Sequence, residues 1–190
     1  MHLGVRAQES SLSDVFAPGE RLRMPPYQRS YSWGESEALE LLGDLQEATE
    51  AQIPHFIGAV VFVHGEEPGI LEIVDGQQRL TTLTILICVL RDLEPDKDRA
   101  RKLHTLIADD ARPILGEGAN WRIALNYQDG AFFRDTIQRP GATLVLDADP
   151  GESESQARMV ANAAAFHKEL GQMTPEQRRA LAEITMKGCA

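Results

Sequence analysis

Two patterns of apolar residues occupy the middle of the chain, between residues 56 and 93. Residues 56–63 and 69–74 are rich in β-branched and aromatic side chains, which favour buried strands. The sequence Gly-Glu-Glu-Pro at residues 65–68 is typical of a turn, so the two strands are predicted to form an antiparallel hairpin. From residue 77 or 78 to residue 92 the chain is apolar on almost every side of a helix, which predicts a helix at the centre of the fold.

The first fifty residues alternate between short ordered elements and turn signals. Residues 11–16 fit one helical turn, and residues 21–24 alternate as in a strand, which the two prolines that follow would end. Ser32 and Glu35 have the spacing of a capping box, which predicts a helix over residues 34–51.

The second half of the chain is predicted to be mainly helical. The pattern indicates helices at residues 99–109 and 129–138 and a strand at residues 122–126. The acidic segment 147–154 contains glycine and proline and is the best linker candidate.

Two capping sequences predict the last two helices. Ser153 with Gln156 opens one, and the sequence Thr-Pro-Glu-Gln at residues 174–177 opens the other. The first of these helices has an apolar stripe made of Met159, Ala163, Phe166 and Leu170. The second reaches residue 190 without a stop signal, so we expect the chain to be part of a longer protein.

The composition is that of an ordinary globular protein, with 43% hydrophobic and 25% charged residues. Its longest apolar runs, residues 56–63 and 83–90, are far shorter than the roughly 18 residues of a membrane span. The N-terminus lacks a signal-peptide core, and two cysteines form no disulfide framework. We expect a reduced cytoplasmic protein that does not bind membranes.

The net charge of −10 argues against a surface that binds nucleic acid broadly, because such binding depends on lysine and arginine displacing counterions. The charges are unevenly spread, however, since several arginines lie within the first thirty residues. A local basic face with weak, salt-dependent DNA binding is therefore the expectation.

The strongest chemical signal is the run Asp75-Gly76-Gln77-Gln78-Arg79, between a predicted strand and a predicted helix. A strand-to-helix turn presents free backbone N–H groups that suit a phosphate. Gly76 would allow close backbone approach, and Arg79 could bind phosphate oxygens. Asp75 could hold a metal ion or orient water, while Gln77 and Gln78 could position water or a base edge.

A purely structural interpretation of this run stays open. Asp75 would then cap the amino end of the helix, and Arg79 would pair with Glu72 or Asp75.

A second signal is the aromatic, arginine-containing loop at residues 27–33. Tyr27, Gln28, Arg29 and Ser30 have the composition of a segment that stacks on bases and binds phosphates, which makes them candidate DNA-binding residues. The structural alternative is that the later aromatic residues of the loop anchor it in the core. We favour that alternative for Trp33 and a functional contact for Arg29.

Three segments together carry a resemblance to a known family: Tyr-Gln-Arg-Ser-Tyr-Ser-Trp at residues 27–33, Phe-Ile-Gly at 56–58, and Asp-Gly-Gln-Gln-Arg-Leu-Thr-Thr-Leu at 75–83. Their order and spacing resemble the GmrSD N-terminal domain family. The resemblance implies an α+β fold, with a ParB/sulfiredoxin-like mixed core over residues 1–95 and appended C-terminal helices over residues 96–190.

The resemblance also implies nucleotide binding and hydrolysis at the Asp-Gly-Gln-Gln-Arg run. The expected catalytic residues are Asp75, Gln77, Gln78 and Arg79, with Asp75 holding Mg²⁺. The expected contacts to the nucleoside triphosphate are Arg29, Gly76, Arg79 and Thr81. No Gly-x-x-x-x-Gly-Lys-Ser/Thr loop occurs in the sequence, so such a nucleoside triphosphatase would not be of the P-loop type.

The biological role that the resemblance implies is restriction of modified foreign DNA, including glucosylated phage DNA, and some relatives sense phosphorothioate DNA. A C-terminal HNH-type nuclease usually accompanies such domains. The five histidines here are scattered, so we expect that nuclease in a later part of the chain or in a partner chain.

Two functions therefore remain open. One is a nucleoside triphosphatase that controls DNA cleavage; the other is a non-catalytic module that binds modified DNA. A homo-oligomer is compatible with either.

Overall fold

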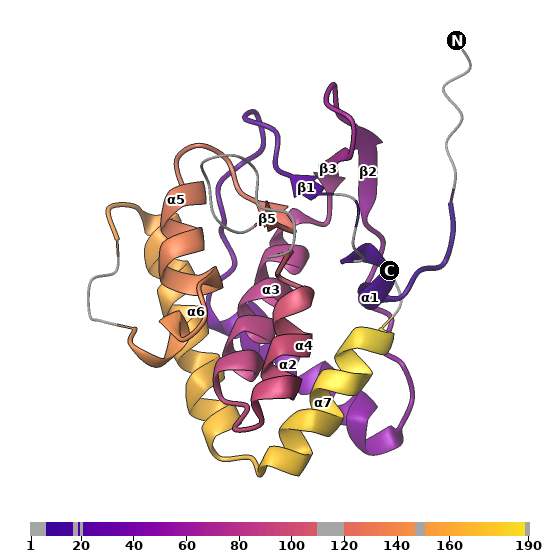
Figure 1. Ribbon diagram of the computed structural model, residues 1–190, viewed down its shortest axis with the longest axis vertical. Helices are drawn as coiled ribbons and strands as arrows, with labels where there is room; N and C mark the ends of the chain where they lie inside the picture. Colours follow the sequence, from indigo (N-terminus) through magenta and orange to yellow (C-terminus); the bar gives the residue numbers. More distant parts are fainter. Residues whose placement is uncertain (1–6, 17–18, 20, 110–119, 147–150, 189–190) are drawn as a thin grey trace.

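The structure is a computed structural model that describes residues 7–16, 19, 21–109, 120–146 and 151–188. Helices surround one central helix, and a small sheet lies at one end of this helical body (Figure 1). The mixture of helices and strands confirms the α+β class.

The central helix is α3, Gln77–Asp92, at the position that the apolar pattern predicts. Its side chains are buried on every side, including Leu80, Leu83 and Leu86, each with no exposed surface. Three buried threonines donate their hydroxyl protons to the carbonyl groups four residues earlier, so their donors are satisfied within the helix: Thr81, Thr82 and Thr84.

The sheet has the strand order β2-β3-β1-β6, with bounds Arg21–Arg23 for β1, Val61–His64 for β2, Ile70–Asp75 for β3 and Ile123–Ala124 for β6. Strands β2 and β3 form the predicted antiparallel hairpin, and β1 runs parallel to both β3 and β6. The sheet thereby places the carboxyl end of β3 directly before α3.

The prediction of a buried strand over residues 56–63 is wrong in both extent and burial. The strand begins only at Val61, because Gly58 adopts the left-handed region with φ of 92° and interrupts the extended path. Strand β2 also lies at the edge of the sheet, where Val61 and Val63 are each 45% exposed.

Helix α2, Glu35–Ala51, forms as predicted, but its cap differs from the prediction. The N-cap is Gly34, whose N–H donates to Oε2 of Glu37 at 3.0 Å. Ser32 cannot take this place because its own N–H donates to a glutamine of α3, which keeps the chain outside the helix at that point.

The region after α3 is more broken than predicted. Helix α4 ends at Thr105 instead of continuing to residue 109, and after a two-residue turn Ala108 and Asp109 form a strand. Of the predicted strand at 122–126, only Ile123 and Ala124 form a strand, β6, and the predicted helix at 129–138 is an α-helical turn that continues into a π-helical turn. The elements are α4 (Lys97–Thr105), β4 (Ala108–Asp109), β5 (Asn120–Trp121), α5 (Gly130–Phe133), η1 (Arg134–Gln138) and η2 (Ala142–Leu144).

The last two helices, α6 (Glu154–Gly171) and α7 (Pro175–Lys187), have the predicted caps. Ser153 accepts from the N–H of Gln156, and Thr174 forms a capping box with Gln177. The predicted stripe of α6 is buried and packs against α2 and α3. The predicted linker, 147–154, lies partly outside the described residues.

Helix α7 packs against α2 and also against α1, Leu12–Val15, which lies within the predicted helical turn at residues 11–16 and has Ser11 as its N-cap. The N–H of Leu12 donates to the carbonyl of Gly188 at 2.8 Å, so the first and last described segments lie side by side.

Candidate functional site

The turn between β3 and α3 requires glycine for two reasons. Gly76 is the N-cap of α3 and adopts the left-handed region with φ of 87°. A Cβ atom at this position would also lie 2.6 Å from Cγ1 of Val60, well inside van der Waals contact. The backbone of the turn therefore approaches the segment before β2 more closely than any other residue would allow.

The amino end of α3 has no side-chain cap. The carboxylate of Asp75, which the structural interpretation assigned to capping, accepts instead from the N–H of its neighbour Gly76 at 2.8 Å. The intrahelical bonds begin with the N–H of Leu80 donating to the carbonyl of Gly76, so the N–H groups of the three preceding residues have no intrahelical acceptor. These groups form the positive end of a 16-residue helix, a favourable place for an anion.

Arg79 packs on the backbone of Gly58. A Cβ atom at Gly58 would lie 2.8 Å from Nη1 of Arg79, so glycine is what admits the guanidinium. The suggested pairing with Glu72 is wrong, because Glu72 is bound to Arg23 at 2.9 Å. Within the described ranges, Arg79 makes no side-chain hydrogen bond or ion pair, and its charge remains available to a ligand.

The loop at residues 27–33 is fastened alongside the same turn. Nε2 of Gln28 donates to the carbonyl of Val74 at 3.0 Å, and Nε2 of Gln77 donates to the carbonyl of Arg29 at 3.3 Å. The backbone of Arg29 therefore lies at the first turn of α3, with its side chain exposed. Tyr27, at the tip of the loop, is 74% exposed.

Both the oxygen and the nitrogen of the Gln78 side-chain amide bind this loop. Its Oε1 accepts from the N–H groups of Ser32 at 2.7 Å and Trp33 at 3.3 Å, and its Nε2 donates to the carbonyl of Ser30 at 3.3 Å. Gln78 was proposed from the sequence as a catalytic residue. In the structure its side chain holds the loop in place. Its neighbour Gln77 differs, because the buried Oε1 of Gln77 has no hydrogen-bond partner among the described residues.

Thr81 is brought near the turn in sequence but not to the surface. Its side chain has no exposed area, and its hydroxyl donates to the carbonyl of Gln77 at 2.8 Å. The expected contact between Thr81 and a nucleotide is therefore not provided by this arrangement.

The aromatic residues at the inner end of the loop are anchors, as the structural alternative predicted for Trp33. The Tyr31 hydroxyl lies 2.7 Å from Oγ1 of Thr82 and accepts from Nδ2 of Asn162 at 2.7 Å, while Trp33 packs partly buried against the core. Burial raises the pKa of Tyr31 to about 12, so this hydroxyl stays protonated at neutral pH.

Two residues of α6 that the sequence did not single out complete these contacts. Nδ2 of Asn162 also donates to the carbonyl of Trp33 at 3.1 Å, and Arg158 donates to the carbonyl of Ser32. The available signal was an asparagine inside the apolar stripe of a predicted helix, because a fully buried amide needs partners from another segment.

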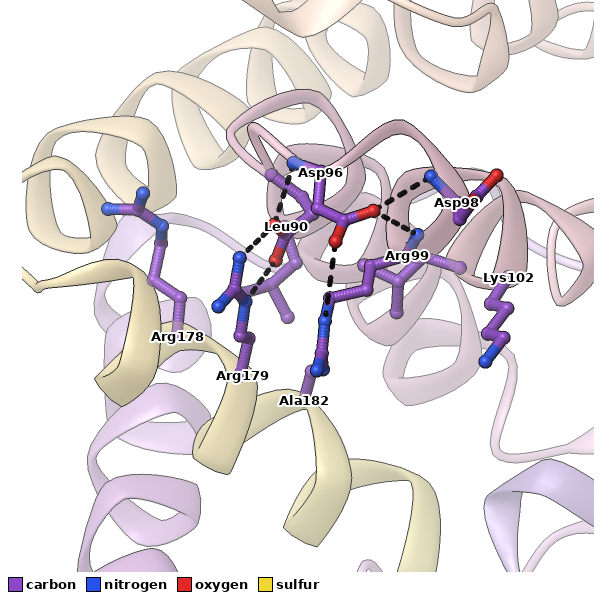
Figure 2. A pocket seen from close by; sticks show the side chains of 10 residues that line it. Leu90, Asp96, Asp98, Arg99, Lys102, Arg178, Arg179 and Ala182 are labelled. Atoms are coloured by element: carbon purple, nitrogen blue, oxygen red, sulfur yellow. Dashed lines mark hydrogen bonds and ion pairs between the residues drawn. The ribbon is translucent and has the colours of Figure 1, made fainter.

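A pocket of about 350 Å³ lies at the opposite end of α3, away from this turn (Figure 2). It is bounded by the carboxyl end of α3, the start of α4 and the first half of α7. Its central charges are paired: Arg179 donates to Glu94 at 2.7 and 2.9 Å, and Asp96 accepts from the first N–H groups of α4. The pocket is therefore an assembly of structural contacts, separate from the unpaired groups at the amino end.

No helix in the described part of the chain is long and apolar enough to cross a membrane. No curated protein sequence matches the chain. The family model described as the N-terminal domain of the GmrSD restriction endonuclease matches residues 12–187, which includes the loop, the turn and α6. Because this match spans nearly the whole chain, the protein belongs to the family of GmrSD restriction endonuclease N-terminal domains and is a component of a restriction system with a role in defence.

Proposed function

We propose that the turn at residues 75–79 binds the phosphates of a nucleoside triphosphate and hydrolyses the nucleotide, as the regulatory step of restriction. The observation that carries the proposal is the uncapped amino end of α3 beside an unpaired arginine, Arg79. Family membership gives the restriction context, and this geometry supports the choice of ligand.

Phosphate binding would use both the backbone and the side chains. The free N–H groups at the start of α3 would donate to phosphate oxygens, and Arg79 would add a charge-assisted contact worth about 1.5–3 kcal/mol. Arg29 would contribute a second charge from the loop.

Asp75 is the residue proposed to act in hydrolysis. Its carboxylate is exposed beside the free amides and could orient a water molecule or hold Mg²⁺. The described residues contain no group of three or more metal-binding side chains, and a single carboxylate suits Mg²⁺, which takes most of its ligands from phosphate and water. The ion would neutralise the charge that develops on the phosphate.

The two glutamines would have different tasks. Gln77 keeps a buried, unpaired Oε1 that could accept from a ligand or from an attacking water molecule. Gln78 binds three residues of the loop through both ends of its amide, so we assign it to positioning and not to the chemical step.

The second candidate function is recognition of modified DNA by the same loop. The exposed Tyr27 and Arg29 favour it, since an aromatic ring and a guanidinium can stack on bases and bind phosphates. The basic face is smaller than expected because Arg23 is paired with both Glu67 and Glu72. Binding to unmodified DNA should therefore be weak and should fall further with salt. Anisotropy titrations with plain and modified duplexes at several salt concentrations would measure this.

Phosphate release by the purified domain with Mg²⁺ and each nucleoside triphosphate tests the hydrolysis. We expect release from the unmodified chain and loss of turnover in Asp75→Ala, with a melting temperature close to that of the unmodified chain. Asp98→Ala is the matched control, an exposed aspartate on α4. Normal turnover by Asp75→Ala would contradict the role given to Asp75.

A further inference from the structure

The loop at residues 27–33 is held on its inner side by two helices that are far apart in sequence. The Tyr31 hydroxyl lies between Thr82 of α3 and Asn162 of α6, 2.7 Å from an atom of each. All three side chains are buried, and those of Thr82 and Asn162 have no exposed surface.

Helix α6 holds three consecutive residues of the loop. Asn162 donates to the Tyr31 hydroxyl and to the carbonyl of Trp33, and Arg158 donates to the carbonyl of Ser32. The two α6 residues are four apart, so they lie on the same face of the helix. Helix α6 therefore forms a hydrogen bond with each of three consecutive loop residues, Tyr31, Ser32 and Trp33.

The same stretch of loop is bound on its other side by the first turn of α3. Gln78 accepts from the N–H groups of Ser32 and Trp33, whose carbonyl groups face the donors on α6. A shift of α6 would thus pull the loop backbone away from the first turn of α3, and would displace Arg29 two residues before Tyr31.

Packing alone does not account for these polar groups. A buried polar group is costly without its full set of partners, and Oδ1 of Asn162 has no partner among the described residues. A leucine of similar size would fill the apolar stripe of α6 without that cost. The amide N–H groups of Asn162 donate to the loop, so we infer that Asn162 serves to hold the loop in place.

We propose that Asn162 and Tyr31 are positioning residues: α6 acts through them to place Arg29 at the amino end of α3, where it contacts the nucleotide. This inference rests on the proposed function. It assigns a task to a helix that lies about 80 residues beyond the turn in sequence.

The variants that test it are Tyr31→Phe and Asn162→Leu, which remove the hydrogen bonds and keep the approximate shape. Thr82→Val and Thr84→Val form a matched pair on α3. Both lose a bond to a carbonyl of the helix, but only Thr82 also contacts Tyr31.

Hydrogen exchange at the N–H groups of Ser32 and Trp33 is the first measurement, and it needs no nucleotide. We expect about fivefold faster exchange or more in Tyr31→Phe, Asn162→Leu and Thr82→Val, and no change in Thr84→Val. Unchanged exchange in the first three variants would overturn the inference.

The second measurement is nucleotide affinity in a double-mutant cycle with Arg29→Ala. If Asn162 acts through Arg29, Asn162→Leu weakens nucleotide binding about fivefold in the unmodified chain and has no further effect in Arg29→Ala. A general structural role would give additive losses in the cycle, and that result would overturn the inference. Absence of nucleotide binding by the unmodified chain overturns the proposed function itself, and with it the nucleotide part of this inference.

Discussion

The two ends of α3 differ in whether their charged side chains have partners within the chain. At the carboxyl end, Arg91 and Asp92 form an ion pair at 2.7 Å with each side chain 3% exposed, and Glu94 binds Arg179. At the amino end, Arg79 makes no side-chain hydrogen bond or ion pair within the described ranges, and the helix has no side-chain cap. The partners within the chain give the carboxyl end a structural task, and the unpaired arginine at the amino end supports the ligand site proposed above.

The carboxyl end should therefore dominate stability. Asp92 accepts from the N–H of Gly141 and from Thr143, and Arg91 donates to the carbonyl groups of Gln138 and Arg139, so the pair joins α3 to the η1–η2 region. His104 belongs to the same buried set, with Nδ1 3.3 Å from Nη1 of Arg91.

The largest expected effect is the loss of stability in Asp92→Ala. This change leaves the charge of Arg91 buried without its counter-ion, which costs about 3–5 kcal/mol in the free energy of unfolding. Chemical denaturation measures it, with Asp98→Ala as the exposed control. A loss below about 1 kcal/mol would show that the carboxyl end is no more structural than the surface.

The same pair predicts a dependence on pH. Burial raises the pKa of Asp92, but the hydrogen bond and charge of Arg91 outweigh this, and the pKa lies below its ordinary value. A lowered folded-state pKa means that the contribution is complete above the ordinary pKa of aspartate and is lost as the pH falls through the lowered value. Unfolding curves at decreasing pH should therefore show a loss of stability that Asp92→Ala lacks.

The next effect in size is expected for Gly76→Ala. A side chain in the left-handed region costs about 1–2 kcal/mol, and the clash with Val60 adds to this. Gly141→Ala is the matched control, because Gly141 has φ of 80° and open space around its missing Cβ. Equal losses in the two variants would show that the close approach of Val60 does not constrain the turn.

The comparison also shows how far the sequence alone could lead. Several elements were predicted correctly because their signals are local in the sequence. These signals are the apolar pattern of α3, the Gly-Glu-Glu-Pro turn, and the caps at Ser153 and Thr174. The start of β2 could not be predicted in the same way, since it depends on Gly58 turning to admit a side chain from α3.

The candidate site could be predicted only in part from the sequence. Its two segments were chosen because their residue types are unusual for a strand-to-helix turn and a loop, and the structure places these segments side by side. The hydrogen bonds that Gln78 and Asn162 make to the loop could not be foreseen, because both depend on partners 45 to 131 residues away. The burial of the Thr81 side chain could not be foreseen either, because it depends on which side of α3 faces the core.

The smallest expected effect on stability belongs to Arg79→Ala. Its guanidinium rests on Gly58 without a charged partner among the described residues, so the free energy of unfolding should change by no more than about 0.5 kcal/mol. Thermal melts beside Asp92→Ala measure the contrast between the two ends. A large loss would mean that Arg79 has a structural task.

Nucleotide binding by that same variant tests the central claim most directly. Calorimetric titration with a non-hydrolysable nucleoside triphosphate and Mg²⁺ would compare the unmodified chain, Arg79→Ala and the control Arg101→Ala, an exposed arginine on α4. Loss of a charge-assisted contact should weaken binding by Arg79→Ala about tenfold to a hundredfold and leave Arg101→Ala unchanged. Equal affinity in all three proteins, or no binding by the unmodified chain, would contradict the assignment of the amino end of α3 to a nucleotide.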